Sequence, residues 1–296
     1  ISTGHDMIFG EDTLYGVMGI TDLTDGNIFL FRSDLNGTTD KVAIDRPNTT
    51  SDIENMSLWQ DDNGNYRFVA CDTEVNNGSM TYAITNDARI NGDTTGSILH
   101  HVIDPGMGGP AGCVGRQITN ENSASLWIAN EGVGGKPQEY VFNTSSSDPS
   151  SLAVNTSNSY GTFSDHQFSD LDFLYDESQD DAWIAGALYL DFEVGIYRNA
   201  NSQGAYTEEA SISLEGTDPP ERVSMSHNND TVIAAWTTET SEHGLLWWKN
   251  GTQGQANLSL SFEPTGIEVH LLNDGIHALV LAHNADSIEM AVFQLF

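Results

Sequence analysis

The chain has 296 residues, and 43 acidic residues against 10 Lys and Arg give it a net charge of −33 at pH 7. This balance excludes nucleic acid as a partner, because no basic patch is available to neutralise phosphates. Six Trp, nine Tyr and twelve Phe argue against an acidic disordered segment. So many like charges oppose folding at low salt, whereas a Debye length of roughly 3 Å at molar salt screens them. We therefore expect a halophilic protein, from a haloarchaeon or one of its viruses.

A pair of strands recurs six times along the chain. The first strand of each pair is apolar and carries small residues, at 16–20, 68–71, 126–129, 182–186, 232–236 and 278–282. The second strand is aromatic, at 28–31, 80–84, 140–142, 195–198, 245–248 and 290–293. A period of roughly 45 to 60 residues with four strands in each repeat is typical of β-propeller blades. The sequence predicts an all-β fold, a single six-bladed β-propeller of four-stranded antiparallel blades.

The turn signals divide this single domain, residues 1–296, into blades. The predicted blades cover approximately residues 5–46, 47–104, 111–160, 166–216, 220–263 and 266–296. In the fifth blade, the turn at 250–252 precedes an outer strand expected at 258–262, where apolar and polar residues alternate. No outer strand follows 288–296, so residues 1–4 are expected to complete the last blade and close the ring.

Polar residues stand where the innermost strand of each blade begins, around the mouth of the axial channel. They are Asp6, Asp52, Glu54, Arg116, Asp170, Asp172, Glu221, Arg222, Glu268 and His270. Two interpretations stay open. These side chains pair with neighbouring blades and hold the ring together, or some of them bind a sugar, a cation or a cationic ligand. The ligand-binding candidates are Glu54, Arg116, Asp172, Arg222, Glu268 and His270.

The repeat resembles repeat-type six-bladed propellers, which include sialidase-like and other glycan-directed proteins. Turns at 33–38, 198–204 and 249–252 echo the Asp-box turn of sialidases, Ser-x-Asp-x-Gly-x-Thr-Trp. The resemblance implies three arginines that clamp a substrate carboxylate and a Tyr–Glu nucleophile pair. Only Arg116 and Arg222 stand where inner strands begin, with Arg46 as a third candidate, so the chain departs from this pattern.

The two cysteines are the next candidates for a structural role. Cys71 and Cys113 are predicted to form a disulfide between neighbouring blades, and two separate buried thiols are the alternative.

His100 and His101 are expected to point to opposite faces of one strand, and the Asp-rich turns at 22–27 and 61–65 lack the calcium-loop pattern. No cofactor is expected, although a structural cation stays open. The Gly-rich segment 104–112 lacks the residues of a phosphate loop, and is read as a rim loop or a plain connection.

The sequence also favours an exported protein. The longest apolar runs have the length of a strand, so no membrane insertion is expected. Nine Asn-x-Ser/Thr sequons are candidate glycosylation sites, namely Asn36, Asn48, Asn55, Asn77, Asn143, Asn155, Asn229, Asn250 and Asn257. We expect an extracellular, cell-surface or virion-surface location in a high-salt environment.

Three functions follow as hypotheses. The favoured one is a non-catalytic propeller that recognises a surface glycan or glycoprotein, such as a virion spike, tail adhesin or adhesion module. The loops at 105–112 and 217–222 and an aromatic such as Trp247 or Trp248 would do the recognising. The second is a glycoside hydrolase or lyase with Asp52, Asp170, Asp172 or Glu268 as acid and base. The third is a structural subunit of a larger surface assembly.

Overall fold

A computed structural model describes a large part of the chain. The described residues are 5–9, 13–20, 27–34, 39–45, 53–60, 66–72, 79–85, 99–103, 110–118, 123–130, 137–143, 154–159, 163, 166–176, 178–200, 205–214, 218–228, 230–240, 242–284 and 286–296. Side chains are described at 55–59, 67, 69, 112–116, 124–129, 137, 139 and 163, and at all described residues from 166 onward.

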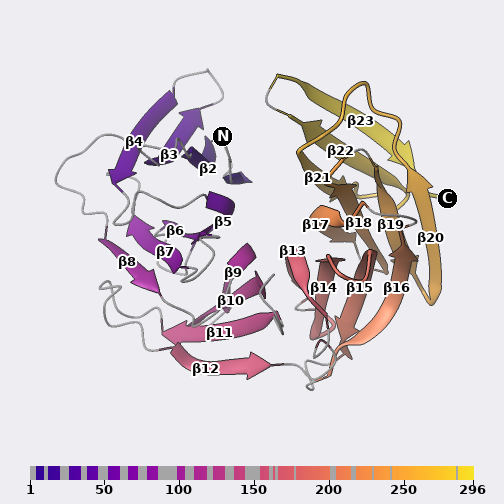
Figure 1. The fold of residues 1–296 in the computed structure, drawn as a ribbon, viewed down its shortest axis with the longest axis horizontal. Coiled ribbons are helices and arrows are strands. Elements are labelled where there is room, and N and C mark those ends of the chain that lie inside the picture. Colours follow the sequence, from indigo (N-terminus) through magenta and orange to yellow (C-terminus); the bar gives the residue numbers. More distant parts are fainter. Residues whose placement is uncertain are drawn as a thin grey trace. The chain divides into compact units, whose positions relative to one another are not determined.

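The chain divides into two compact units, residues 1–133 with 138–159 and residues 134–137 with 160–296. The first unit holds three antiparallel sheets (Figure 1). Their strands are β1 (His5–Phe9), β2 (Thr13–Ile20), β3 (Asn27–Asp34), β4 (Thr39–Asp45); β5 (Ile53–Gln60), β6 (Tyr66–Asp72), β7 (Ser79–Thr85), β8 (Leu99–Ile103); and β9 (Pro110–Ile118), β10 (Ser123–Asn130), β11 (Gln138–Asn143), β12 (Val154–Ser159).

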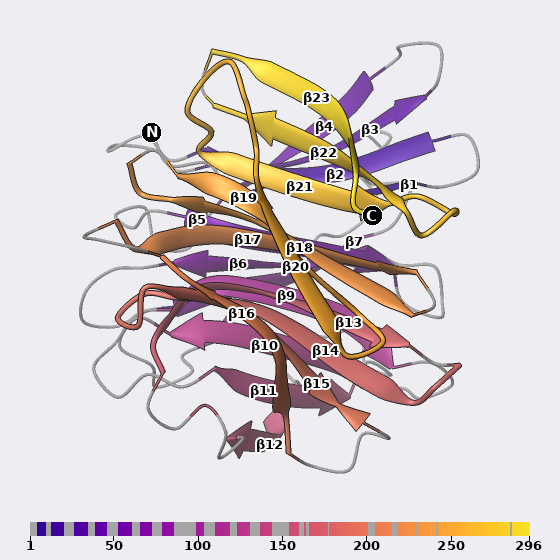
Figure 2. The ribbon, with the colours of Figure 1, turned by 90° about the vertical axis from the view of Figure 1, so that its right-hand side faces the viewer.

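The second unit holds the other three sheets. Their strands are β13 (Phe168–Asp176), β14 (Asp181–Leu188), β15 (Glu193–Asn199), β16 (Thr207–Ser213); β17 (Pro220–Asn228), β18 (Thr231–Thr238), β19 (His243–Lys249), β20 (Thr252–Asn257); and β21 (Gly266–Leu271), β22 (His277–His283), β23 (Ile288–Gln294). Figure 2 views this unit from its outer edge, with β16 and β20 in front.

Every sheet is an antiparallel meander in which each strand pairs with the next along the chain. Five sheets have four strands and the last has three, as the repeated strand pairs predicted. Residues 1–4, expected to complete the last sheet, lie outside the described residues. Within the described part of the chain, no helix has the length and apolar character needed to cross a membrane.

Two hairpin turns in the second unit follow directly from their sequences. Asn250 and Gly251 both have positive φ, 49° and 79°, which is the conformation of the tightest two-residue hairpins. Gly275 has φ of 63° in the turn between β21 and β22, where the carboxylate of Asp274 accepts the backbone N–H groups of Ile276 and His277. The turn at 250–252 was predicted from these residues.

The outer strand of the fifth sheet is not where the alternation placed it. Residues 258–262 were predicted to form it, but β20 spans Thr252–Asn257 and begins directly after the Asn250–Gly251 turn, with Lys249 opposite Thr252. The tight turn requires immediate pairing, so the polar, largely exposed segment Thr252–Asn257 becomes the strand. Leu258 is instead buried beyond the strand end, and its N–H bonds to the carbonyl of His243.

In the second unit, the second strands of the first two sheets supply much of the core. All residues of β14 and β18 are buried, as expected for strands covered on both faces. One apolar cluster joins the sheets of β13–β16 and β17–β20, with Trp183, Ile196, Met225 and Trp236 among its members. A second cluster joins β17–β20 to β21–β23. The sheets of this unit are therefore held face to face by alternate sides of the same strands.

Gly186 on β14 leaves room for an aromatic ring. A Cβ atom at this position would lie 2.1 Å from Cε1 of Phe168, a fully buried side chain. The Phe168 ring also packs edge-to-face on Phe163, with ring centroids 5.4 Å apart. Because the ring is enclosed, it has little freedom to move away.

We therefore expect Gly186→Ala to lower the free energy of unfolding by about 1–3 kcal/mol, the usual cost of overpacking a core. Urea denaturation at molar KCl measures the change. Ser213→Ala, at an exposed position of β16, is the control and should leave the midpoint nearly unchanged. An equal midpoint for Gly186→Ala and the parent protein would contradict the tight packing of Phe168.

Candidate functional site

The first strands of adjacent sheets are joined by side chains that bond to backbone. Asp170 and Asp172 alternate along β13 and point toward β17. Oδ2 of Asp170 accepts the N–H of Val223 at 3.0 Å, and Oδ2 of Asp172 accepts the N–H of Met225 at 2.7 Å. Their Oδ1 atoms accept the N–H groups of Leu171 and Phe173. All four carboxylate oxygens are thus used within the protein.

Serines make the same connection elsewhere. On β17, the hydroxyls of Ser224 and Ser226 accept the N–H groups of Val269 and Leu271 on β21. In the first unit, Ser57 on β5 accepts the N–H of Gly115 on β9 at 2.9 Å. We call these bonds the inner-strand ladder. The sequence left open whether Asp170 and Asp172 hold blades together, and in this geometry they do.

Burial dominates the electrostatics of these carboxyls. It raises the pKa of Asp170 from 3.8 to about 7, against the opposing effects of the Arg222 guanidinium and the Val223 N–H. Burial likewise raises the pKa of Asp172 to about 6, although the N–H groups of Met225 and Phe173 favour its charged form. Both carboxyls therefore titrate near neutral pH.

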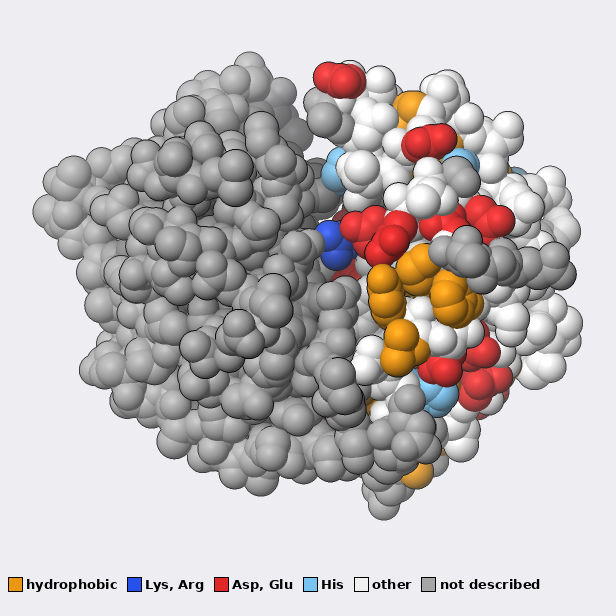
Figure 3. Space-filling view, in the orientation of Figure 1, with side chains coloured by type: hydrophobic (Ala, Val, Ile, Leu, Met, Phe, Trp, Pro, Cys, Tyr) orange, Lys and Arg blue, Asp and Glu red, His pale blue; other side chains and the backbone are white. Residues whose placement is uncertain are grey.

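An accessible polar group lies next to the ladder on β17 and β21. It consists of Glu221, Arg222, Glu268 and His270, and we call it the inner-strand polar group. Glu221 and Arg222 approach to 3.8 Å, with side chains 39% and 19% exposed. Glu268 and His270 are exposed, and Ser224 donates to Oε2 of Glu268 at 2.9 Å. Figure 3 shows a basic side chain flanked by acidic ones on this unit. Donors and acceptors together suit a polyhydroxylated ligand.

The other predicted site residues belong to the first unit. Arg116 is half-buried on β9, opposite Ser125. The side chains of Asp6, Asp52 and Glu54 lie outside the described ones, as do Arg46 and residues 104–109. Pro110 to Gly112 belong to β9 rather than to a rim loop. Asn250 and Asn257 are exposed sequon asparagines, whereas Asn55 is half-buried on β5.

Cys113 does not form the disulfide predicted with Cys71. It is a free, buried thiol, and its Sγ lies 3.7 Å from the carbonyl oxygen of Asn55 on β5. The side chain of Cys71 lies outside the described ones. Among the described residues, no group of three or more His, Cys, Asp or Glu side chains is arranged to hold a metal ion.

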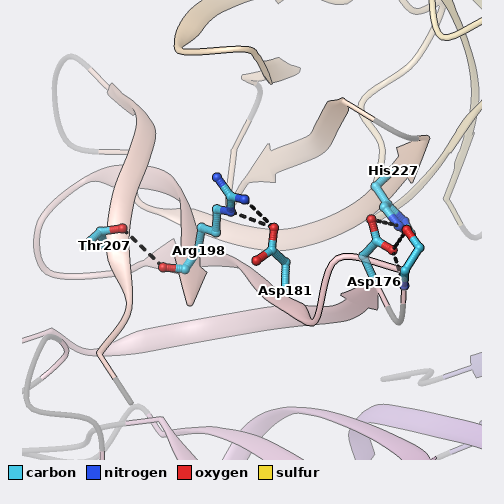
Figure 4. Close-up of polar contacts among 6 residues, drawn as sticks. Asp176, Asp181, Arg198, Thr207 and His227 are labelled. Carbon is cyan, nitrogen blue, oxygen red and sulfur yellow. Dashed lines mark hydrogen bonds and ion pairs between the residues drawn. The ribbon is translucent and has the colours of Figure 1, made fainter. Parts of the chain in front are cut away.

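Sequence reasoning missed a second polar cluster, at the other ends of β14 and β15. Arg198 binds the buried Asp181 (Figure 4). Its guanidinium also lies over the Trp183 and Trp248 rings. Asp176 and His227 form a separate pair nearby at 3.9 Å. The strand pattern could have indicated part of this cluster, because Trp183 and Arg198 are directly opposite each other when β14 pairs with β15. Trp247 and Trp248 pack against apolar clusters on opposite faces of β19, and both are half-buried.

No protein-family model and no curated protein matches the sequence. Solved structures do match the fold. A six-bladed propeller lectin with a fucose recognition mode, from Aleuria aurantia, has a TM-score of 0.59 and 9% identity over 99% of this chain and 95% of its own. Trypanosoma rangeli sialidase has a TM-score of 0.57 and 13% identity over 100% of this chain, but only 55% of its own. The gluconolactonase of Pseudomonas aeruginosa has a TM-score of 0.54 and 12% identity over 97% of this chain and 84% of its own.

The fold is a six-bladed β-propeller. This confirms the architecture predicted from the repeated strand pairs. A lectin, a sialidase and a lactonase share it, so the fold alone does not assign a function.

The raised pKa of Asp170 makes a stability prediction. Its folded-state pKa of about 7 exceeds the ordinary 3.8, so the folded state binds the proton more tightly than the unfolded state. This contribution to the free energy of unfolding is present below about pH 4 and is lost as the pH rises to about 7. Asp170→Asn removes the titration and keeps an acceptor oxygen for Val223. The stability of the variant relative to the parent should therefore rise from pH 4 to pH 8, as measured by urea denaturation.

Glu289→Gln is the matched control. Hydrogen bonds from the hydroxyl and the N–H of Ser261 hold the pKa of Glu289 below its ordinary 4.5. Its contribution is lost only as the pH falls below about 4.5, so the difference from the parent should stay nearly constant between about pH 6 and pH 8. A constant difference for Asp170→Asn over that range would show that the ladder carboxyl does not titrate there.

Proposed function

We propose that the chain is a non-catalytic recognition propeller that binds a surface glycan or glycoprotein. One observation carries the proposal: both oxygens of Asp170 and of Asp172 are bonded to backbone N–H groups. A general acid or base needs a carboxyl within reach of the substrate. Carboxyls committed to the inner-strand ladder serve structure instead.

The inner-strand polar group supports recognition of a glycan. Arg222 donates hydrogen bonds, Glu221 and Glu268 accept them, and each side chain has access to solvent. Sugars present hydroxyls that both donate and accept, so such a mixed group suits them. The likeness to fucose-binding propeller lectins makes this ligand class a natural one to test first.

A glycoside hydrolase is the second candidate. The pKa of Asp170, raised by burial to about 7, is what a general acid at neutral pH requires, and a sialidase shares the fold. Asp170 is, however, only 3% exposed and its oxygens are occupied. Catalysis would require opening the contact between β13 and β17.

We further propose that the protein works in a high-salt extracellular environment, on a cell or virion surface. The net charge of −33 and the exposed sequons at Asn250 and Asn257 support this location. Acidic side chains are spread over the described surface in Figure 3.

The charge predicts salt-dependent folding. Because screening reduces the mutual repulsion of carboxylates, the Tm should rise steadily between about 0.1 M and about 3 M KCl. Circular dichroism of the β signal measures it. Sucrose, which is excluded from protein surfaces but does not screen charge, is the comparison. A Tm that is independent of KCl would contradict the halophilic proposal.

The recognition function is tested with glycans at molar KCl. We expect binding to an array of neutral and acidic glycans, or to envelope glycoproteins, without release of sugar on prolonged incubation. Asp170→Asn keeps an acceptor oxygen for the Val223 N–H and so preserves the ladder bond, and glycan binding should persist in this variant. Mass spectrometry of the supernatant detects released sugar.

Sugar release that is abolished by Asp170→Asn would establish the hydrolase instead. Release that persists in this variant would place catalysis on another carboxyl. Absence of any glycan binding at molar salt would contradict the recognition proposal.

A further inference from the structure

Arg198 lies between two tryptophans from neighbouring sheets. It stands at the end of β15, and Cζ of its guanidinium is 5.2 Å from the centroid of the Trp183 ring and 5.9 Å from that of Trp248. Trp183 comes from β14 and Trp248 from β19, and their ring centroids are 5.2 Å apart with a 50° tilt. The cluster therefore bridges the sheets of β13–β16 and β17–β20.

A buried carboxylate fixes the orientation of this guanidinium. Nε of Arg198 donates to Oδ2 of Asp181 at 2.9 Å, and Nη2 donates to the same oxygen. The Asp181 side chain is 3% exposed and that of Arg198 is 27% exposed. In Figure 4 the remaining guanidinium nitrogen points away from Asp181. A planar donor group is thus held in one orientation while part of it stays accessible to solvent.

This combination matches the chemistry of a sugar ring. Guanidinium N–H groups donate to hydroxyl oxygens, and aromatic rings pack against the apolar C–H face of a pyranose. Trp248 is half-buried whereas Trp183 is only 4% exposed, so Trp248 is the aromatic ring of this cluster that a ligand can reach. Fixing the donor in advance reduces the ordering cost of binding.

The surrounding charges favour a neutral sugar over an acidic one. A sugar carboxylate would compete with Asp181 for Arg198 and approach a chain of net charge −33. Hydrogen bonds and ring contacts with a neutral ligand are short-ranged, so molar salt weakens them little.

We propose that Arg198 and Trp248 form a binding site for a neutral pyranose, with Asp181 and the buried Trp183 as the residues that position Arg198. This site deepens the proposed glycan recognition and rests on it. It is separate from the inner-strand polar group, because its residues come from β14, β15 and β19 rather than from β17 and β21.

Isothermal titration at molar KCl tests the site with methyl α-L-fucoside, methyl β-D-galactoside, methyl α-D-mannoside and D-glucuronate. Arg198→Lys keeps the charge beside Asp181 but loses the planar fork, and should weaken binding of the preferred neutral glycoside about tenfold or more. Trp248→Leu removes the aromatic face and should weaken it similarly. Phe296→Leu is the control, because Phe296 is 50% exposed and contacts Trp247 on the opposite face of β19.

Tryptophan fluorescence gives a second readout. The bound glycoside should quench it in the parent protein and in Phe296→Leu but not in Trp248→Leu, whereas a purely structural role of Trp248 predicts no quenching by the glycoside in the parent protein. Arg222→Gln separates the two candidate sites. Binding that survives Arg198→Lys and Trp248→Leu but is lost in Arg222→Gln overturns this site while upholding the proposed function. Preference for D-glucuronate overturns the neutral ligand class. Binding of no glycan by the parent protein overturns both proposals.

Discussion

The inner-strand ladder is the interaction on which the rest of the described structure depends. Among the described strands, backbone pairing stays within each sheet. Apolar packing between the sheets is non-directional, so it does not by itself fix how far one sheet slides along the next. Ladder bonds between two strands are spaced two residues apart on both strands. Asp170 accepts the N–H of Val223, and Asp172, two residues on, accepts the N–H of Met225. The paired spacing sets the register between sheets, and the positions of Arg222 and Glu268 follow from it.

The ladder also divides the acidic residues into two populations. Among the described carboxylates, Glu268 and Asp274 are exposed, whereas Asp170 is enclosed and burial raises its pKa to about 7. The buried carboxyls bind backbone, whereas the accessible ones pair with side chains, Glu221 with Arg222 and Glu268 with Ser224. A similar division holds for arginine: Arg198 is oriented by a buried Asp181, while Arg222 lies beside an exposed Glu221.

The sequence was sufficient for the architecture and insufficient for the sites. Strand positions could be predicted because apolar runs such as 182–186 and 232–236 and turns such as Asn250–Gly251 are local signals. The outer strand at Thr252–Asn257 was missed because its polar residues carry no strand pattern and only the turn determines it. Asp170 could be recognised as an inner-strand residue, but its partner is a backbone N–H 53 residues away, which no side-chain pattern reveals. Arg198 was missed for a related reason, since its tryptophans come from two different sheets.

Because the ladder joins a side chain to backbone, it demands only a short side chain with an oxygen. The acceptor is an aspartate on β13 and a serine on β17 and β5. In each case the donor is a backbone N–H on the first strand of the following sheet. Successive repeats can therefore change residue by residue without loss of the contact that aligns them. A lineage built on such repeats can drift far in sequence while its geometry persists, which is consistent with identities of 9–13% to proteins that share the fold.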